Sequence, residues 1–252
     1  MMIDTHCHIL KEDYDNIEEV IKNMKDNIMI VSTASPKDIE EVVELTNKYK
    51  NIYATIGIHP EHADTYNIDD LNKIEKYLAN EKIVGIGEIG LDYHYTKENK
   101  EKQKELFIKQ IKLANKYNKT IVIHSRDAIE DTYNIIKENK QANIKCDLHC
   151  YSGSLEMAEK FVKINTKFGI GGVLTFKNEK KLKEIVTKLD LENFVLETDS
   201  PYLTPEPLRG KKNEPRNIKY VAEKIAELKN IDINEVFKKT TNNAKKLFDL
   251  KI

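Results

Sequence analysis

Short apolar runs rich in β-branched residues alternate along this chain with longer stretches of helical periodicity. In segment 97–117, for example, Phe107, Ile111 and Ala114 recur at the spacing of one helix face. Short apolar runs bounded by turn residues are typical of buried strands. The sequence contains eight such runs, at residues 1–6, 28–35, 52–60, 83–90, 120–125, 144–150, 167–173 and 194–201.

The regular alternation of strand and helix predicts the architecture. Strands separated by helices pair in parallel, and eight of them in a chain of 252 residues favour a closed α/β barrel, the (β/α)8 fold. Residues 214–250 contain two helical segments where a minimal barrel needs one, so we expect an extra C-terminal helix. Because no linker interrupts the pattern, we interpret residues 1–252 as a single barrel domain.

Histidines and acidic residues gather where the expected strands end. They are His6 and His8 in the first strand, Glu88 in the fourth, His124 in the fifth, His149 in the sixth and Asp199 in the eighth. The carboxyl ends of barrel strands meet at one mouth, where barrel enzymes build their active sites. Singly, each histidine could be a packed core residue and Asp199 a turn cap. Together they indicate a metal site.

The number of ligands predicts two ions. A single catalytic ion usually takes about three protein ligands, so six side chains suit two divalent ions, with the carboxylate of Glu88 bridging them. We assign His6, His8 and Asp199 to one ion and His124 and His149 to the other. Imidazole and carboxylate ligands fit Zn²⁺ or Mn²⁺, and Mg²⁺ is an alternative.

Composition narrows the classes of partner. Lys and Arg number 41 against 42 Asp and Glu, so a polyanion must be held by a local patch and not by the net charge of −1. Three cysteines form neither a disulfide framework nor a CxxC pair. The first residues lack a signal-peptide pattern, and no apolar run is long enough to span a membrane. We therefore expect a cytoplasmic protein without a membrane or obligate protein partner.

Short motifs in order along the whole chain carry a family resemblance. "IDTHCH", "GIHP", "GEIGLDY", "IHSRDA", "HCYSGS", "GIGG", "ETDSPYLTP" and "RGKKNEP" together resemble the TatD family of metal-dependent deoxyribonucleases. The resemblance implies a TIM barrel, a divalent-metal site and exonucleolytic hydrolysis of DNA. The family's ligand pattern carries over onto the same six residues. One departure is "GLDYHY", which places His94 beside the expected mouth as a possible substrate contact.

A nuclease also needs groups that bind the substrate and move a proton. We expect Asp199 to accept a proton from the attacking water and Glu88 to share in catalysis. The resemblance suggests His59 as a substrate contact. Arg126, Arg209 and Asn213 are our further candidates on the rim, where guanidinium groups suit phosphate.

Two other functions remain open at this stage. The same site could serve a D-aminoacyl-tRNA deacylase or another ester or amide hydrolase, since fold does not decide among them. A non-catalytic binding protein is a more remote alternative, because such a protein should have lost at least one of the ligands.

Strict strand alternation leads to one further expectation about the barrel interior. It places Asp4, Lys145, Asp147 and Glu197 inside the barrel, where these charges would have to be paired.

Overall fold

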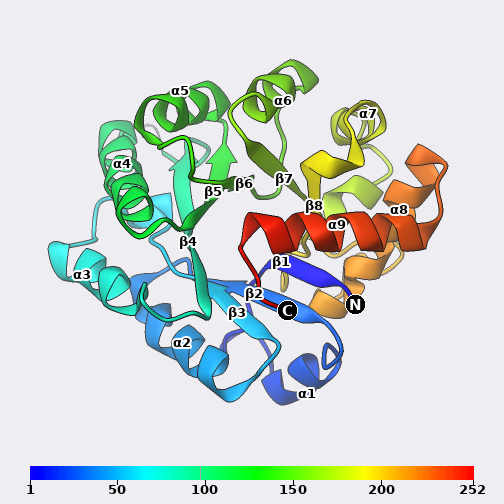
Figure 1. Ribbon diagram of the computed structural model, residues 1–252, viewed down its shortest axis with the longest axis horizontal. Coiled ribbons are helices and arrows are strands. Elements are labelled where there is room, and N and C mark those ends of the chain that lie inside the picture. Colours follow the sequence, from blue (N-terminus) through cyan, green and yellow to red (C-terminus); the bar gives the residue numbers. More distant parts are fainter. Residues whose placement is uncertain (97) are drawn as a thin grey trace.

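The computed structural model describes residues 1–96 and 98–252, and its eight strands confirm the predicted barrel. All pair in parallel, in chain order from β1 to β8 (Figure 1). Each apolar run named above overlaps one of them. The strands are β1 (Ile3–Cys7), β2 (Ile28–Ser32), β3 (Ile52–Thr55), β4 (Ile83–Asp92), β5 (Thr120–Arg126), β6 (Cys146–Leu148), β7 (Thr166–Ile170) and β8 (Phe194–Leu196).

Helices cover the outside of the barrel. They are α1 (Ile17–Lys22), α2 (Ile39–Lys48), α3 (Ile68–Tyr77), α4 (Lys100–Tyr117), α5 (Ile129–Asn139), α6 (Leu155–Val162), α7 (Lys181–Lys188), α8 (Ile218–Lys229) and α9 (Ile233–Leu247). Short 3₁₀ turns occupy Pro36–Asp38, Pro60–His62, Gly172–Thr175, Leu191–Asn193 and Pro215–Asn217. The predicted extra C-terminal helix is α9.

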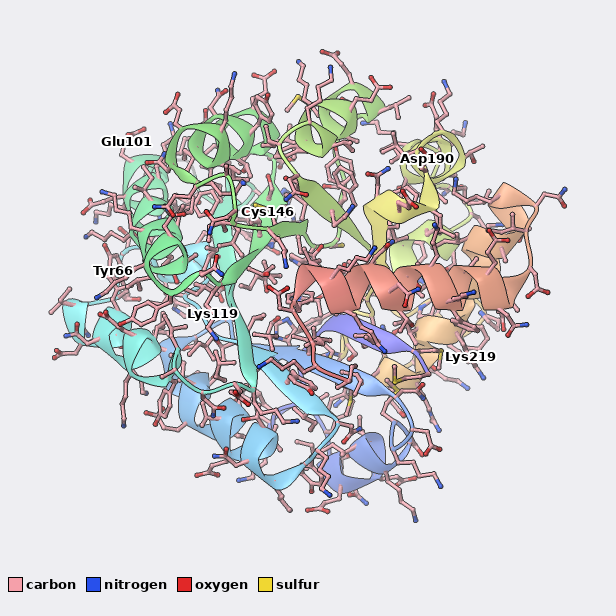
Figure 2. All side chains as sticks on the ribbon, viewed as in Figure 1. Tyr66, Glu101, Lys119, Cys146, Asp190 and Lys219 are labelled. Carbon is pink, nitrogen blue, oxygen red and sulfur yellow. The ribbon has the colours of Figure 1, made fainter. Side chains whose placement is uncertain are left out.

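The apolar faces of the helices pack on the strands as their periodicity predicts. Phe107, Ile111 and Ala114 of α4 are fully buried, whereas Lys97, the first residue of that expected segment, lies outside the described residues. Figure 2 shows Glu101 and Lys219 projecting from the helical layer, while Cys146 of β6 is buried inside it. No described helix is both long and apolar enough to cross a membrane.

The extra helix closes the amino-terminal end of the barrel. Figure 1 shows α9 lying across this end, beside β1 and β8. The end of α9 and the residues after it, including Leu247 and Phe248, form an apolar cluster with strand residues such as Ile3 and Val122. This packing leaves the carboxyl ends of the strands as the accessible mouth.

The first and last strands, β1 and β8, and the residues that follow them are joined by individual hydrogen bonds near this mouth. The Thr5 hydroxyl donates to the Leu196 carbonyl (3.1 Å). Beyond β8, the Asp199 N–H donates to the His6 carbonyl (3.0 Å), and the His8 N–H donates to the Ser200 carbonyl (2.7 Å). The segment after β8 is thereby held against the end of β1, which places Asp199 beside the two histidines.

The expectation about charges in the interior is correct for three residues and wrong for Lys145. Asp4, Asp147 and Glu197 are fully buried. Lys145 instead lies at the closed end, where its Nζ donates to the Lys246 carbonyl (2.6 Å) and to Asp249 Oδ1 (2.5 Å). Lys145 directly precedes β6, so its long side chain reaches past the barrel end to these acceptors.

We had expected these buried acids to be paired with cations, but no lysine or arginine of residues 1–96 and 98–252 forms an ion pair with Asp4, Asp147 or Glu197. Asp4 accepts hydrogen bonds from Thr198, and burial raises its pKa to about 8. Burial likewise raises the pKa of Asp147 and of Glu197. Burial without a cation therefore favours the neutral form of these carboxylic acids, because a buried carboxylate without a cation is very costly.

Candidate metal centre

The six predicted ligands converge at the open mouth of the barrel. They come from β1, from β4, from β5 and from the residues just after β1, β6 and β8. Their side chains range from fully buried for His6 to 18% exposed for His124. Asp199 takes a left-handed backbone conformation (φ 52°), which Asp tolerates better than most residues.

Four donor atoms form the first group of candidate ligands. His6 Nε2 lies 3.2 Å from His8 Nε2, 3.4 Å from Glu88 Oε2 and 3.6 Å from Asp199 Oδ1. His8 Nε2 lies 3.7 Å from Glu88 Oε2 and 3.6 Å from Asp199 Oδ1. Donors about 2.1 Å from a tetrahedrally bound ion are about 3.4 Å apart. The group therefore fits one divalent ion.

The other oxygen of Glu88 belongs to a second group. Glu88 Oε1 lies 2.8 Å from His124 Nδ1 and 2.8 Å from His149 Nε2, and these two nitrogens are 3.3 Å apart. Each carboxylate oxygen of Glu88 thus faces a different set of histidines. A carboxylate placed in this way would hold an ion on each side, and the donor chemistry of both groups fits divalent ions.

Outer hydrogen bonds orient three of the histidines. His8 Nδ1 lies 3.0 Å from the Ser32 carbonyl, so it carries the proton and leaves the Nε2 lone pair facing the first group. His6 Nδ1 lies 3.1 Å from the Ser32 hydroxyl. His124 Nε2 lies 3.0 Å from Asp92 Oδ2, which leaves Nδ1 for the second group. Ser32 and Asp92 are therefore part of the centre.

Mutual contacts set the protonation of the metal-free centre. Burial acts to raise the pKa of Glu88, but His149, His124 and His6 hold it well below its usual value. Burial acts to lower the pKa of His8, but Asp199 and Glu88 raise it to about 9. Asp92 and Glu88 likewise overcome burial at His124 and raise its pKa to about 9. A cation that binds here displaces protons from His8 and His124.

The predicted substrate contacts lie at different depths. His59 is close to the ligands, with Nε2 3.7 Å from Glu88 Oε1, and burial lowers its pKa to about 3. Arg126 ends β5 on the rim, where its Nη1 donates to the Tyr95 hydroxyl (3.3 Å). Arg209 stacks on the Phe176 ring, with its guanidinium carbon 4.1 Å from the ring centroid.

The expectation for Asn213 is wrong. Its side chain is fully buried, and its Nδ2 donates to the carbonyls of Thr198 (3.0 Å) and Tyr202 (2.8 Å). Its Oδ1 accepts from the Glu214 N–H and from Asn217 Nδ2. With all its hydrogen-bonding groups used, Asn213 holds the loop after β8 in place and does not face a substrate.

His94 is at the edge of the mouth and pairs with another loop residue. Its Nδ1 lies 3.2 Å from Asp127 Oδ2, and 46% of its side chain is exposed. The ring also packs edge-on against Tyr95, with centroids 5.0 Å apart. His94 therefore belongs to the outer rim on the side of Arg126.

Asp92 and Ser32 are the residues of the centre that sequence reasoning missed. Asp92 is four residues beyond Glu88 in β4, and even spacing along a strand places side chains on one face. That spacing was a usable signal for Asp92. Ser32 acts through its carbonyl as well as its hydroxyl, and no sequence pattern identifies such a carbonyl.

In the Asp92→Asn variant we expect one of the two metal equivalents to bind about 10- to 100-fold more weakly. This is the usual effect of losing a carboxylate that hydrogen-bonds a metal-ligating histidine. The ion held by His6 and His8 should bind as in wild type, since Asp92 contacts only His124 among the ligands. Isothermal titration calorimetry with Mn²⁺ would measure both. Equal weakening of both equivalents would contradict the division into two donor groups.

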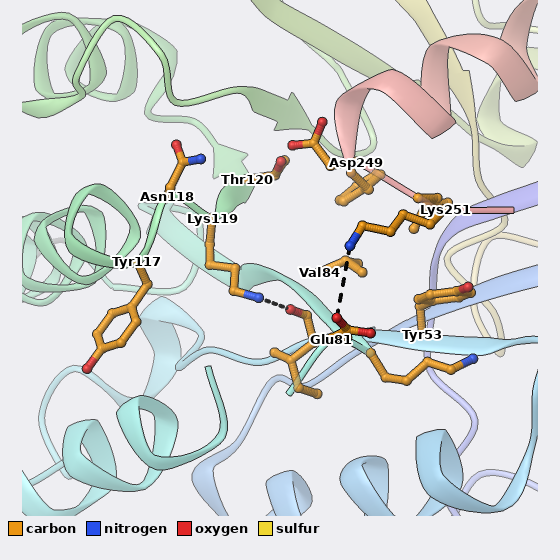
Figure 3. A pocket seen from close by; sticks show the side chains of 13 residues that line it. Tyr53, Glu81, Val84, Tyr117, Asn118, Lys119, Thr120, Asp249 and Lys251 are labelled. Atoms are coloured by element: carbon orange, nitrogen blue, oxygen red, sulfur yellow. Dashed lines mark hydrogen bonds and ion pairs between the residues drawn. The ribbon is translucent and has the colours of Figure 1, made fainter. Parts of the chain in front are cut away.

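A cavity of about 420 Å³ opens above the centre. Its lining includes five of the six predicted ligands together with His59 and Tyr202. A second cavity of about 310 Å³ lies at the closed end of the barrel (Figure 3). There Lys119 donates to the Ile83 carbonyl (2.5 Å) and Lys251 lies 3.9 Å from Glu81, and none of the predicted ligands lines it. Of these two cavities, the first is the one that opens onto the metal-ligand groups.

Comparisons with known proteins agree with this geometry. A family model described as TatD related DNase matches residues 3–249. The chain is 46% identical over 253 residues to YabD, an uncharacterized metal-dependent hydrolase of Bacillus subtilis (strain 168), with 98% of this chain and 99% of that protein covered. It is 33% identical over 263 residues to YcfH, an uncharacterized metal-dependent hydrolase of Escherichia coli (strain K12), with 99% and 96% covered.

A solved structure supports the same assignment. The crystal structure of YJJV, a TatD homolog from Escherichia coli k12, aligns with a TM-score of 0.89 at 28% identity, covering 99% of this chain and 98% of that one. The structural similarity covers the whole barrel, as does the match to the family model. The chain therefore belongs to the TatD family of metal-dependent hydrolases.

Proposed function

We propose that this protein is a deoxyribonuclease that removes nucleotides from the 3′ end of single-stranded DNA by hydrolysing phosphodiester bonds. The observation that carries the proposal is the Glu88 carboxylate, whose two oxygens face two separate histidine groups at the floor of an open cavity. Paired sites of this kind serve the in-line displacement of phosphoryl transfer.

Different residues of the chain have different roles in the proposed reaction. Two divalent ions, when bound, supply Lewis acidity that activates water and offsets charge on phosphoryl oxygens. Asp199 lines the cavity with 15% of its side chain exposed, so its carboxylate is accessible to accept a proton from the attacking water. Burial acts to raise its pKa, but contacts with His8, His149 and His6 lower it, which keeps Asp199 ionised.

Two further side chains suit the phosphate. The His59 Nδ1 accepts the Glu61 N–H (3.3 Å), so Nε2 carries the proton and points towards the centre as a donor. Arg126 offers a guanidinium on the rim beyond His124, where bidentate contacts with phosphate oxygens are favourable. Together they would hold a phosphodiester across the mouth while Asp199 acts on the water.

The proposal is tested with a 5′-labelled single-stranded DNA oligonucleotide and purified protein stripped of metal. We expect no cleavage without metal, and a ladder that shortens from the 3′ end when Mg²⁺ or Mn²⁺ is restored. Release of D-amino acid from charged tRNA is measured in parallel. An intact oligonucleotide together with deacylation of the tRNA would refute the deoxyribonuclease and favour the deacylase.

A further inference from the structure

One side of the cavity above the metal centre carries an exposed aromatic ring. Tyr202, in the loop after β8, is 60% exposed and lines the cavity. Its ring centroid lies 6.3 Å from that of His8, so the ring stands next to the first donor group. Large exposed aromatic side chains beside a nucleic-acid site are typical platforms for a base, because every base has a face that can stack.

Two hydrogen bonds hold the backbone of Tyr202, while its ring is exposed. The Tyr202 N–H donates to the Asp199 carbonyl (2.9 Å), and its own carbonyl accepts from Asn213 Nδ2 (2.8 Å). The second bond explains what buried Asn213 does for the site. A platform fixed at its main chain loses little conformational entropy when a base packs on the ring.

Acidic residues form the wall around this ring. Glu12 and Asp13 follow β1, and Glu61 follows β3; all three line the cavity. Lys37 is the one lysine among the lining residues within the described chain.

Of the two arginines predicted to bind phosphate, Arg126 lies away from this wall, whereas Arg209 lies in the same loop after β8 as Tyr202. Arg126 ends β5, whereas the acidic wall follows β1 and β3 and Tyr202 follows β8. In a barrel whose strands run in order from β1 to β8, β5 is across from β1. The side of the centre at Arg126 therefore suits the preceding phosphates of a strand, whereas the cavity lining near Tyr202 carries Glu12, Asp13 and Glu61 against Lys37 and disfavours a further phosphate.

We propose that the cavity between Tyr202 and the acidic wall holds the terminal nucleoside of the DNA strand, with its base on the Tyr202 ring and its free 3′-hydroxyl facing Glu12, Asp13 and Glu61. The preceding phosphates run towards Arg126. A strand that ends in a 3′-phosphate would place about two extra negative charges against the wall, so the site selects an unphosphorylated end. This inference rests on the proposed deoxyribonuclease activity and specifies its substrate.

The selectivity is tested with two 5′-labelled oligonucleotides of one sequence, one ending in a 3′-hydroxyl and one in a 3′-phosphate. We expect removal of the first nucleotide to be at least about tenfold slower from the phosphorylated end, and the ratio to shrink as salt screens the wall. Equal rates, or release of the terminal phosphate ahead of the nucleotide, would overturn this inference alone. Cleavage of neither oligonucleotide would overturn the proposed function and this inference with it.

Charge variants test whether the acidic wall causes the preference for a 3′-hydroxyl end. In the double variant Glu12→Gln, Glu61→Gln we expect the ratio between the two ends to fall by at least about threefold, since two of the wall's charges are removed. The control removes two exposed acids of α6, Glu156→Gln and Glu159→Gln, and should keep the wild-type ratio. An equal fall in both double variants would show that net charge, and not the wall, sets the preference.

Substitutions of Tyr202 test the platform. Tyr202→Leu should raise KM for the 3′-hydroxyl oligonucleotide by about tenfold, the usual scale for losing one stacked base, with a much smaller change in kcat. Tyr202→Phe should keep the wild-type KM because it keeps the aromatic face. Two bound Mn²⁺ equivalents in both variants would show an intact centre. A wild-type KM in Tyr202→Leu would remove the platform from the proposal.

Discussion

Replacing Glu88 by Gln is expected to lower kcat/KM by at least about 10³-fold, or about 4 kcal/mol of transition-state stabilisation. The amide keeps the size of the side chain, but it carries no charge and presents one NH₂ group where an oxygen stood. Since each oxygen of Glu88 faces its own histidine group, at 2.8 Å on one side and 3.4 Å on the other, both groups lose a ligand's charge. Metal binding, measured by calorimetry with Mn²⁺, should fall from two equivalents to one or none.

The matched control is Glu81→Gln, just before the same strand. Glu81 has a side chain that is 91% exposed and lies at the closed end of the barrel, so its loss should leave both metal equivalents and the rate unchanged. A Glu88→Gln protein that bound two Mn²⁺ ions and retained a tenth of the wild-type activity would contradict the bridging role. Circular dichroism on both variants would separate loss of function from loss of fold.

Replacing Asp199 by Asn is expected to lower kcat by about 10²- to 10⁴-fold, the range usual for a positioned general base. Asn can keep an oxygen towards His6 and His8, which lie 3.6 Å from Asp199 Oδ1, but it cannot accept a proton at neutral pH. KM for the DNA oligonucleotide should change far less than kcat, because the proposed phosphate contacts are His59 and Arg126. Single-turnover cleavage of the labelled oligonucleotide measures this step.

Asp199 is both a candidate ligand and the candidate base, so metal binding must be measured in the same variant. If calorimetry finds both Mn²⁺ equivalents while kcat falls as expected, the loss belongs to proton transfer. If one equivalent is lost, Asp199 acts mainly as a ligand and another group is the base. Asp190→Asn, on the surface before β8, serves as the control with the same chemical change and should behave as wild type.

Patterns of residue type along the chain were enough to predict the barrel. The eight apolar runs became the eight strands because a parallel barrel buries its strands on both faces, and such strands are continuous in hydrophobicity. The convergence of His6, His149 and Asp199 also followed from the sequence, since all parallel strands end at the same mouth. These inferences needed no knowledge of which atoms touch.

The partners of individual side chains needed the tertiary structure. Asn213 was expected on the surface, yet it is buried under the loop that it supports. Lys145 was expected inside by alternation, yet its length carries it beyond the barrel end to Asp249. Residue type alone specifies neither outcome, because both depend on neighbours that are far away in the sequence.

What the sequence determined by itself was the order of strands and helices and the set of histidines and acids at the strand ends. The tertiary structure decided the distances between these groups and the outer contacts that orient them. Register shifts in β1, between Asp4 and Cys7, and in β4, between Ile86 and Ile89, interrupt the simple alternation of faces next to the ligands. The distances from each Glu88 oxygen to its histidines, and the outer contacts of Ser32 and Asp92, therefore arise from strand register and side-chain packing, which are properties of the folded barrel and not of local sequence.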